Sequence, residues 1–310
     1  GDEAIAIGSD AESTKEKAVA MGADAEATAE SAIAVGGDTT ASGEQSIAFG
    51  SGSKASGACS VSFGSKSFTN AAGAVAIGPC ASSTGVNAIA IGTNTSATCA
   101  NSFVLGAGAI ANGTGAGAIG YLANTQGKNS MAVGVQAYAL GNDAMAVGVQ
   151  ASAVGNSSMA LGTTACSTGT DSIAIGYSAC ASNTNAASIG TNATANGINS
   201  MAFGANSRAS GTNSTAIGAQ SFADQTNSFV IGPNTTACGA NAGAIGASAN
   251  ATGVSSLAIG VQSYAKQTSS LALGTNAKSI GMNSTAIAVN ASANGANSMA
   301  VGYFSISKGV

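Results

Sequence analysis

The chain has 310 residues, of which 44 are Gly, 7% are charged and 4% are aromatic, and its formal net charge is −4. So few charges argue against disorder, and no apolar run is long enough for a transmembrane helix, which needs about 18 residues or more. His is absent, and no basic patch occurs, so catalysis by His and binding of nucleic acid are not expected.

One Gly recurs with a strict 14-residue period along the whole chain. The series runs from Gly8 to Gly302, with one exception at Ala288, and so divides residues 2–309 into 22 repeats without insertion or deletion. A fixed period of this kind is typical of solenoids, in which each repeat packs only on its neighbours. Because no linker or change of composition interrupts the series, we expect a single domain over 1–310. We number each repeat so that this Gly is position 7.

Each repeat predicts two short strands in the same order. Residues 128–141, with the sequence KNSMAVGVQAYALG, show the pattern. Small residues at positions 3 and 5 alternate with larger apolar residues at 4 and 6, and small residues at 10 and 12 flank a variable position 11. Alternation with period 2 predicts strands at positions 3–6 and 10–12. Gly at positions 7 and 14 predicts left-handed backbone in the turns, and Asn at position 2 can tie a turn with its side chain.

The fold class that follows is all-β, a parallel β-solenoid of 22 coils with one 14-residue repeat in each coil. Two strands in so short a coil must lie close together, and a close-packed narrow interior accepts only small side chains. We therefore place positions 3, 5, 10 and 12 inside, position 11 in solvent, and positions 4 and 6 on the outer face. The opposite arrangement, with the large residues inside, stays open at this stage.

The large residues at positions 4 and 6 would form an apolar stripe along the solenoid. At about 4.8 Å per coil this stripe would run for roughly 105 Å, far beyond the apolar patch that a monomer usually exposes. We expect other copies of the chain to bury it in a closed, cyclic assembly. The predicted interface is represented by Val133, Val147, Leu161, Ile175, Phe203, Ile217, Ile231 and Ile259.

The repeats resemble those of a known family. NSMAVG (129–134), DSIAIG (171–176), NSMAFG (199–204) and SSLAIG (255–260) are similar to the NSVAIG-type head repeat of the YadA-like trimeric autotransporter adhesins. The second half of the repeat, as in VQAYALG (135–141), is similar too, and the resemblance covers 2–309. It implies a left-handed parallel β-roll, a homotrimer and exposure on a bacterial outer surface. It also implies attachment to a host matrix protein or a cell-surface receptor such as a CEACAM-type protein.

This resemblance sets further expectations for the chain. We expect a β-roll head domain without the family's neck, stalk or C-terminal anchor, so that contact with the outer membrane would come only through a missing anchor. No cofactor, metal or catalytic group is predicted. Left-handed β-helix acyltransferases build longer coils from hexapeptides and use a catalytic His, and this chain has neither feature. The alternative interpretation is a receptor-binding or structural fibre of a virus or phage, because six Cys are unusual for the family.

A cluster of apolar and Tyr residues at outward positions is the candidate receptor-binding surface, because such patches are typical of protein interfaces. The alternative interpretation is that the Val and Leu at the corners cover neighbouring turns or an adjacent subunit. The candidate residues are Tyr121, Leu122, Val135, Tyr138, Leu140, Val149 and Val154.

Three smaller features carry expectations of their own. Cys166 and Cys180 share position 11 in adjacent coils, within Cα range of a disulfide but with side chains poorly directed for its torsion, so we expect mostly free thiols. Asp10, Asp24 and Asp38 share position 9. These stacked carboxylates could hold Ca²⁺ or simply form a solvated, repulsive end. Gly117 and Gly243 replace the large residue of position 4 and would leave voids at a threefold axis.

Overall fold

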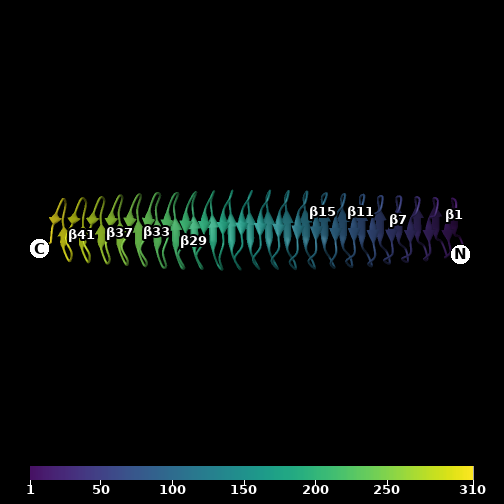
Figure 1. The fold of residues 1–310 in the computed structure, drawn as a ribbon, viewed down its shortest axis with the longest axis horizontal. Helices are drawn as coiled ribbons and strands as arrows, with labels where there is room; N and C mark the ends of the chain where they lie inside the picture. Colours follow the sequence, from purple (N-terminus) through teal and green to yellow (C-terminus); the bar gives the residue numbers. More distant parts are fainter. Residues whose placement is uncertain (310) are drawn as a thin grey trace. The chain divides into compact units, whose positions relative to one another are not determined.

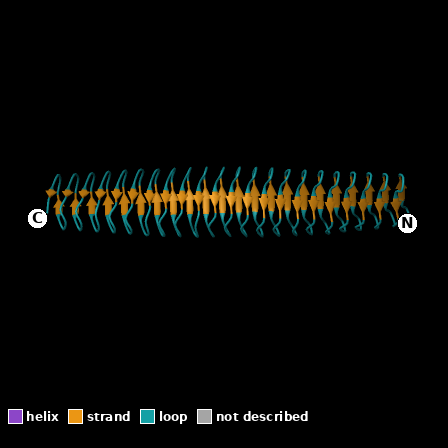
Figure 2. Cartoon of the chain, viewed as in Figure 1, coloured by secondary structure: helices purple, strands orange, loops and turns teal. Residues whose placement is uncertain are grey.

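The structure is a computed structural model that describes residues 1–309 and contains two compact units, Gly1–Ser157 and Ser158–Val310. Every regular element in the described residues is a short β-strand. Strands and loops alternate along each unit (Figure 2). Among residues 1–309 there is no helix long and apolar enough to cross a membrane.

The odd-numbered strands all span positions 4–6 of their repeat, and the even-numbered strands all span positions 11–12. In the first unit the odd strands run from β1 (Ile5–Ile7) to β21 (Met145–Val147) and the even strands from β2 (Glu12–Ser13) to β22 (Ser152–Ala153). In the second unit the odd strands run from β23 (Met159–Leu161) to β43 (Met299–Val301) and the even strands from β24 (Cys166–Ser167) to β44 (Ile306–Ser307). We call the odd strands sheet A and the even strands sheet B.

Each strand pairs in parallel with the equivalent strand of the next coil. Ile5 lies opposite Val19, and Glu12 lies opposite Glu26, so the register equals one repeat. The strands follow one another in chain order within each unit, as the colours of Figure 1 show. The predicted all-β parallel solenoid of 14-residue coils is therefore confirmed. The strands are one residue shorter than predicted, because the N–H groups of positions 3 and 10 close turns instead of joining the ladder, as in the bond from Ala11 N–H to the Gly8 carbonyl.

The two turns of each coil differ from the prediction in one respect. The left-handed residues with φ near +55° lie at positions 2 and 9, as at Asn129 and Gln136, and Gly at position 14 does not adopt this backbone in the repeats before Gly309. Position 14 keeps Gly for another reason, since a Cβ at Gly141 would overlap the backbone of Gly155 in the next coil. Both Pro residues of the chain, Pro79 and Pro233, occupy position 8, the second residue of a turn in which the third is left-handed.

Gly at position 7 is required both by conformation and by space. Its φ lies between 119° and 139°, a region that side chains disfavour. A Cβ at Gly36 would also lie 2.9 Å from the carbonyl carbon of Gly50, one coil further on. Ala288, the single exception, has φ of 107°.

The interior contains small side chains. Ala132 and Ala139, at positions 5 and 12 of one coil, are fully buried, and the largest fully buried side chains in the described residues are those of Val104 and Val230. Because the residues at positions 3, 5, 10 and 12 are the buried ones, their side chains point into the solenoid. The alternative with large residues inside is wrong.

Some of the buried hydroxyls at positions 3 and 10 stabilise the turns. Ser130 Oγ donates to the carbonyl of Gly127 at 2.7 Å, and Thr95 Oγ1 donates to that of Gly92 at 3.0 Å. Each bond joins the last residue of a turn to the first. It satisfies a polar group that would be costly to bury alone. Other hydroxyls at these positions, such as those of Ser46, Ser53 and Ser158, are buried without a hydrogen-bond partner.

Candidate functional site

The outer face of sheet A carries the large apolar residues. Strand β19 (Met131–Val133) is typical, because Ala132 is buried between an exposed Met131 and a half-buried Val133. Among the predicted interface residues, Phe203, Ile217 and Ile231 are exposed. The other five are intermediate: Val133, Val147, Leu161, Ile175 and Ile259. All eight therefore lie on an outward face of their unit and none is buried within the chain.

This face is ordered by contacts between neighbouring coils. In the first unit the rings of Phe49 and Phe63, both at position 6, stack with centroids 4.8 Å apart and planes 6° from parallel. In the second unit the ring of Phe229 lies over Gly243, so that a Cβ on Gly243 would overlap its Cζ. The void predicted at Gly243 is therefore filled by an aromatic ring. Gly117 has more room, since the nearest atom to such a Cβ is Met131 Cγ at 3.9 Å.

Four of the seven candidate receptor-binding residues lie together. Tyr121, Leu122, Val135 and Val149 occupy positions 8 and 9 in three successive coils, and all four are exposed. We call these four residues the turn ridge. The adjacent position 9 side chains interact as well, because Gln150 Nε2 donates to Gln136 Oε1 at 3.1 Å. The turn ridge is thus a continuous, mainly apolar edge of the first unit.

The other three candidates lie elsewhere on the coil. Tyr138, on strand β20 (Tyr138–Ala139), is exposed on the outer face of sheet B. Leu140 and Val154 follow sheet B strands and lie in the turn on the other side of these strands, where Val154 is exposed and Leu140 is half-buried. The structure therefore does not join the seven residues into one patch.

The family comparison covers most of the sequence. The model described as "YadA head domain repeat (2 copies)" matches residues 1–25, 27–53, 54–79, 83–116, 111–137, 126–151, 139–165, 153–179, 167–186, 181–207, 209–235, 237–263, 251–277, 265–287 and 279–305.

This chain belongs to the YadA head repeat family. Among solved structures, the collagen-binding domain of the Yersinia adhesin YadA matches with 23% sequence identity and a TM-score of 0.24, covering 62% of this chain and 82% of that one. No curated protein sequence matches the chain.

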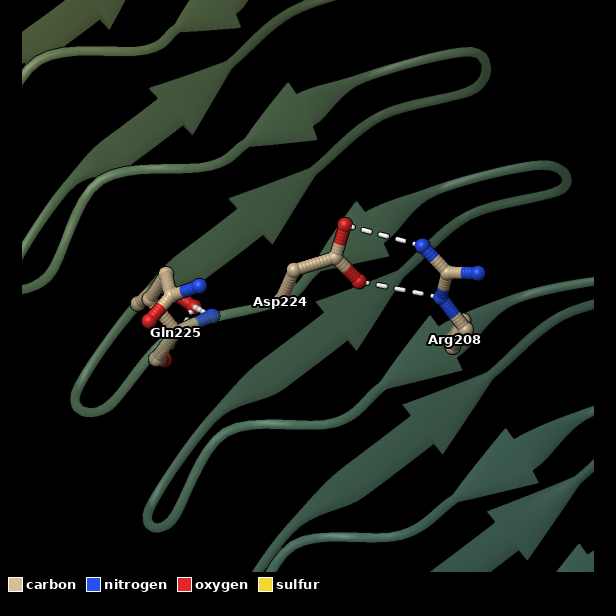
Figure 3. A network of polar contacts seen from close by, with 4 residues as sticks. Arg208, Asp224 and Gln225 are labelled. Atoms are coloured by element: carbon tan, nitrogen blue, oxygen red, sulfur yellow. Dashed lines mark hydrogen bonds and ion pairs between the residues drawn. The ribbon is translucent and has the colours of Figure 1, made fainter.

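The YadA-type head also has a polar cluster that was not predicted from the sequence. Arg208 Nε and Nη2 donate to the two carboxylate oxygens of Asp224, each at 2.9 Å, and the two side chains point toward one another from neighbouring coils (Figure 3). The guanidinium carbon lies 5.2 Å from the ring centroid of Phe222, within the range of a cation–π contact. The hydrogen bonds to Asp224 raise the pKa of Arg208.

A signal for this cluster was present in the sequence. Arg208 is the only Arg of the chain, and it shares position 11 with Phe222 one coil later. Position 11 varies freely along the chain, and apart from Cys166 and Cys180 its neighbours in adjacent coils were not compared. Tyr177, which is 57% exposed at position 8 of the second unit, was not predicted either. Among the described residues, no group of three or more His, Cys, Asp or Glu could hold a metal ion.

Proposed function

We propose that this chain is the head of a trimeric adhesin that is displayed on a bacterial surface and binds a host protein. Membership of the YadA head repeat family supports the adhesin role. The observation that carries the assembly is the outer face of sheet A, where the large apolar residues of each repeat have no cover within the chain. The solvent-facing turns and sheet B carry the binding surface.

The assembly follows from the cost of exposing apolar area. Residues such as Phe203 and Ile231 keep nearly half of their surface accessible, with exposed fractions of 49% and 45%, and equivalent residues recur in every coil. Burying apolar surface contributes about 25 cal/mol per Å², so repetition along the face favours association. Because every copy presents the same face, a closed ring buries it in all subunits, and three copies are the number in the resembling family.

Each unit offers one kind of anchor for a receptor. The turn ridge offers apolar area with Tyr121 at one end, and the Arg208–Asp224–Phe222 cluster offers a preordered cation stacked on a ring. Tyr and Arg are enriched among residues that dominate binding energy. Display of equivalent sites on each copy, and of many copies on one cell, converts weak contacts into firm attachment.

A binding assay on the purified chain tests this function. Immobilised collagens, fibronectin, laminin and CEACAM-type ectodomains are each titrated with the protein, and binding is followed by interferometry. We expect saturable binding to at least one of these proteins. Replacing Tyr121, Val135 and Val149 together by Ser should then weaken binding tenfold or more if the turn ridge is the anchor.

A matched control separates recognition from damage to the fold. Val261 also occupies position 8 and is 47% exposed, compared with 45% for Val149, so Val261→Ser removes the same group outside the turn ridge. This variant should bind as the parent does. If no matrix protein or receptor ectodomain binds, the adhesin proposal is wrong, whereas equal losses in both variants would overturn only the placement on the turn ridge.

A further inference from the structure

Two cysteines of the second unit are direct neighbours on the outer face of sheet B. Cys166 begins β24 (Cys166–Ser167) and Cys180 begins β26 (Cys180–Ala181), and the two residues are Cα partners in the parallel ladder. In-register neighbours lie about 4.8 Å apart, within the Cα range that disulfides span. Both residues are half-buried, and in the structure all six Cys of the chain are free.

The two thiols differ in their readiness to ionise. The interaction between the two side chains is the largest cause of the raised pKa of Cys166 and of the lowered pKa of Cys180, which falls to about 6. Ser182 Oγ, 3.3 Å from Cys180 Sγ, also favours the thiolate. Cys180 is therefore the member of the pair that ionises more readily, while Cys166 holds its proton more firmly. This is the arrangement of a nucleophilic and a resolving cysteine.

The other cysteines lack such a partner. Cys59, Cys80, Cys99 and Cys238 occupy positions 2, 9, 14 and 13, and none has Cys at the same position of the coil before or after it. Cys238 is exposed, yet burial of its thiol is the main cause of a raised pKa. Position 11 of the two adjacent coils is thus the one place in the described residues where a bond between coils needs no rearrangement of the register.

We propose that Cys166 and Cys180 form a reversible disulfide between adjacent coils when the chain meets a disulfide donor. The Cys180 thiolate attacks the donor R–S–S–R, its sulfur bonds to one donor sulfur, and RS⁻ leaves. Cys166 then gives up its proton, its sulfur attacks Cys180 Sγ, and the second RS⁻ leaves with the electrons of the broken bond. The two chain thiols are oxidised by two electrons, and the donor is reduced to two thiols.

The bond would join two coils that otherwise hold together through backbone hydrogen bonds and small interior side chains. Because the two residues are one repeat apart, the link spans neighbouring strands and leaves the outer face of sheet A unchanged. Oxidation therefore fixes this part of the second unit against local separation of coils without altering the proposed assembly face. A thiol reductant restores the original state.

Peptide mapping of the folded, full-length protein tests the proposal. The protein is incubated with oxidised glutathione, its free thiols are blocked with excess iodoacetamide at mildly alkaline pH, and it is cut before Asp under nonreducing conditions. Cleavage before Asp143, Asp171 and Asp224 places Cys166 in 143–170 and Cys180 in 171–223. We expect these two fragments to remain covalently joined and to separate after reduction, while fragments with the other Cys carry the alkyl group.

Two variants test which thiols form the disulfide. In Cys166→Ser the resolving thiol is missing, so Cys180 should retain one glutathione, whereas Cys238→Ser should leave the linked pair unchanged. Two separate fragments with alkylated or glutathionylated Cys166 and Cys180 in the parent protein would overturn the proposal. The reaction depends neither on a trimer nor on a receptor, so its failure would leave the proposed function untouched.

Discussion

The ring of Phe229 lies over Gly243 on the outer face of sheet A, where it fills the space that a side chain would occupy at position 4 of the next coil. A Cβ on Gly243 would overlap Phe229 Cζ and lie 2.9 Å from Leu257 Cδ1. The missing side chain is therefore matched to a large neighbour. Gly117 follows Phe103 in the same register, but its surroundings are open to a methyl group.

This difference predicts opposite effects of the same substitution at two equivalent glycines. Gly117→Ala should stabilise the protein by about 0.5–1 kcal/mol, because Ala loses less backbone entropy in a strand. Gly243→Ala must displace the Phe229 ring, and overpacking of this kind costs about 1–3 kcal/mol. Denaturant midpoints of the two variants and the parent provide the measurement. Equal shifts in both variants would contradict the packing described for Phe229.

Ala288 is predicted to be a strained residue. It occupies position 7 with φ of 107°, where the other repeats have Gly. Ala288→Gly should raise the free energy of unfolding by about 1 kcal/mol, since strained backbone of this kind costs about 1–3 kcal/mol. The reverse change one coil earlier, Gly274→Ala, should destabilise, because its Cβ would lie 2.7 Å from the Ala288 carbonyl. Thermal unfolding of both variants checks the pair, and a lower midpoint for Ala288→Gly would contradict it.

Much of the fold could be predicted because side-chain size repeats at fixed positions. Ala at position 5 and small residues at 10 and 12 were enough to place the interior, since a narrow solenoid admits nothing larger. The turns were harder, because Gly serves two physical needs. At position 7 it provides φ, and at position 14 it allows close approach of backbones. Sequence alone does not separate these two needs, and Asn or Asp at positions 2 and 9 was the better signal of left-handed backbone.

The candidate site was less predictable than the fold. The turn ridge was found, because its residues share adjacent turn positions in successive coils. Leu140 and Val154 were grouped with it by their place in the sequence, although a strand of sheet B separates the two turns. The Arg208–Asp224 pair was missed because it joins position 11 of one coil to position 13 of the next. Such diagonal contacts appear only once the register between coils is known.

Cys180 and Cys238, two of the three thiols of the second unit, should differ in reactivity. Cys180 has its pKa lowered to about 6, so its thiolate dominates at pH 7 and should be lost as the pH falls through 6. Cys238 is more exposed, but its pKa is raised. We expect Cys180 to react faster with iodoacetamide at pH 7 and its advantage to shrink below pH 6. Time-resolved peptide mapping measures both rates, and a faster Cys238 at pH 7 would contradict the assignment.

The outer face of sheet A is the proposed interface, whereas the outer face of sheet B is expected to lie in solvent. A new charge should therefore disturb the assembly only on sheet A. Val133→Asp places a charge on the outer face of sheet A, where burial without a partner would cost several kcal/mol in every subunit. Ser152→Asp places the same charge on the outer face of sheet B, at position 11 of β22. We expect the first variant to lose the trimer and the second to keep it. Similar behaviour of both variants in size-exclusion chromatography would show that sheet A is not the interface.

In the proposed assembly, other copies of the chain cover the apolar face of sheet A. Light scattering on the purified protein, coupled to size-exclusion chromatography, measures its mass in solution without reference to shape. We expect three times the chain mass of 29.0 kDa. A stable, soluble species of 29.0 kDa would mean that the apolar residues of positions 4 and 6 remain exposed to water, and it would contradict the proposed assembly.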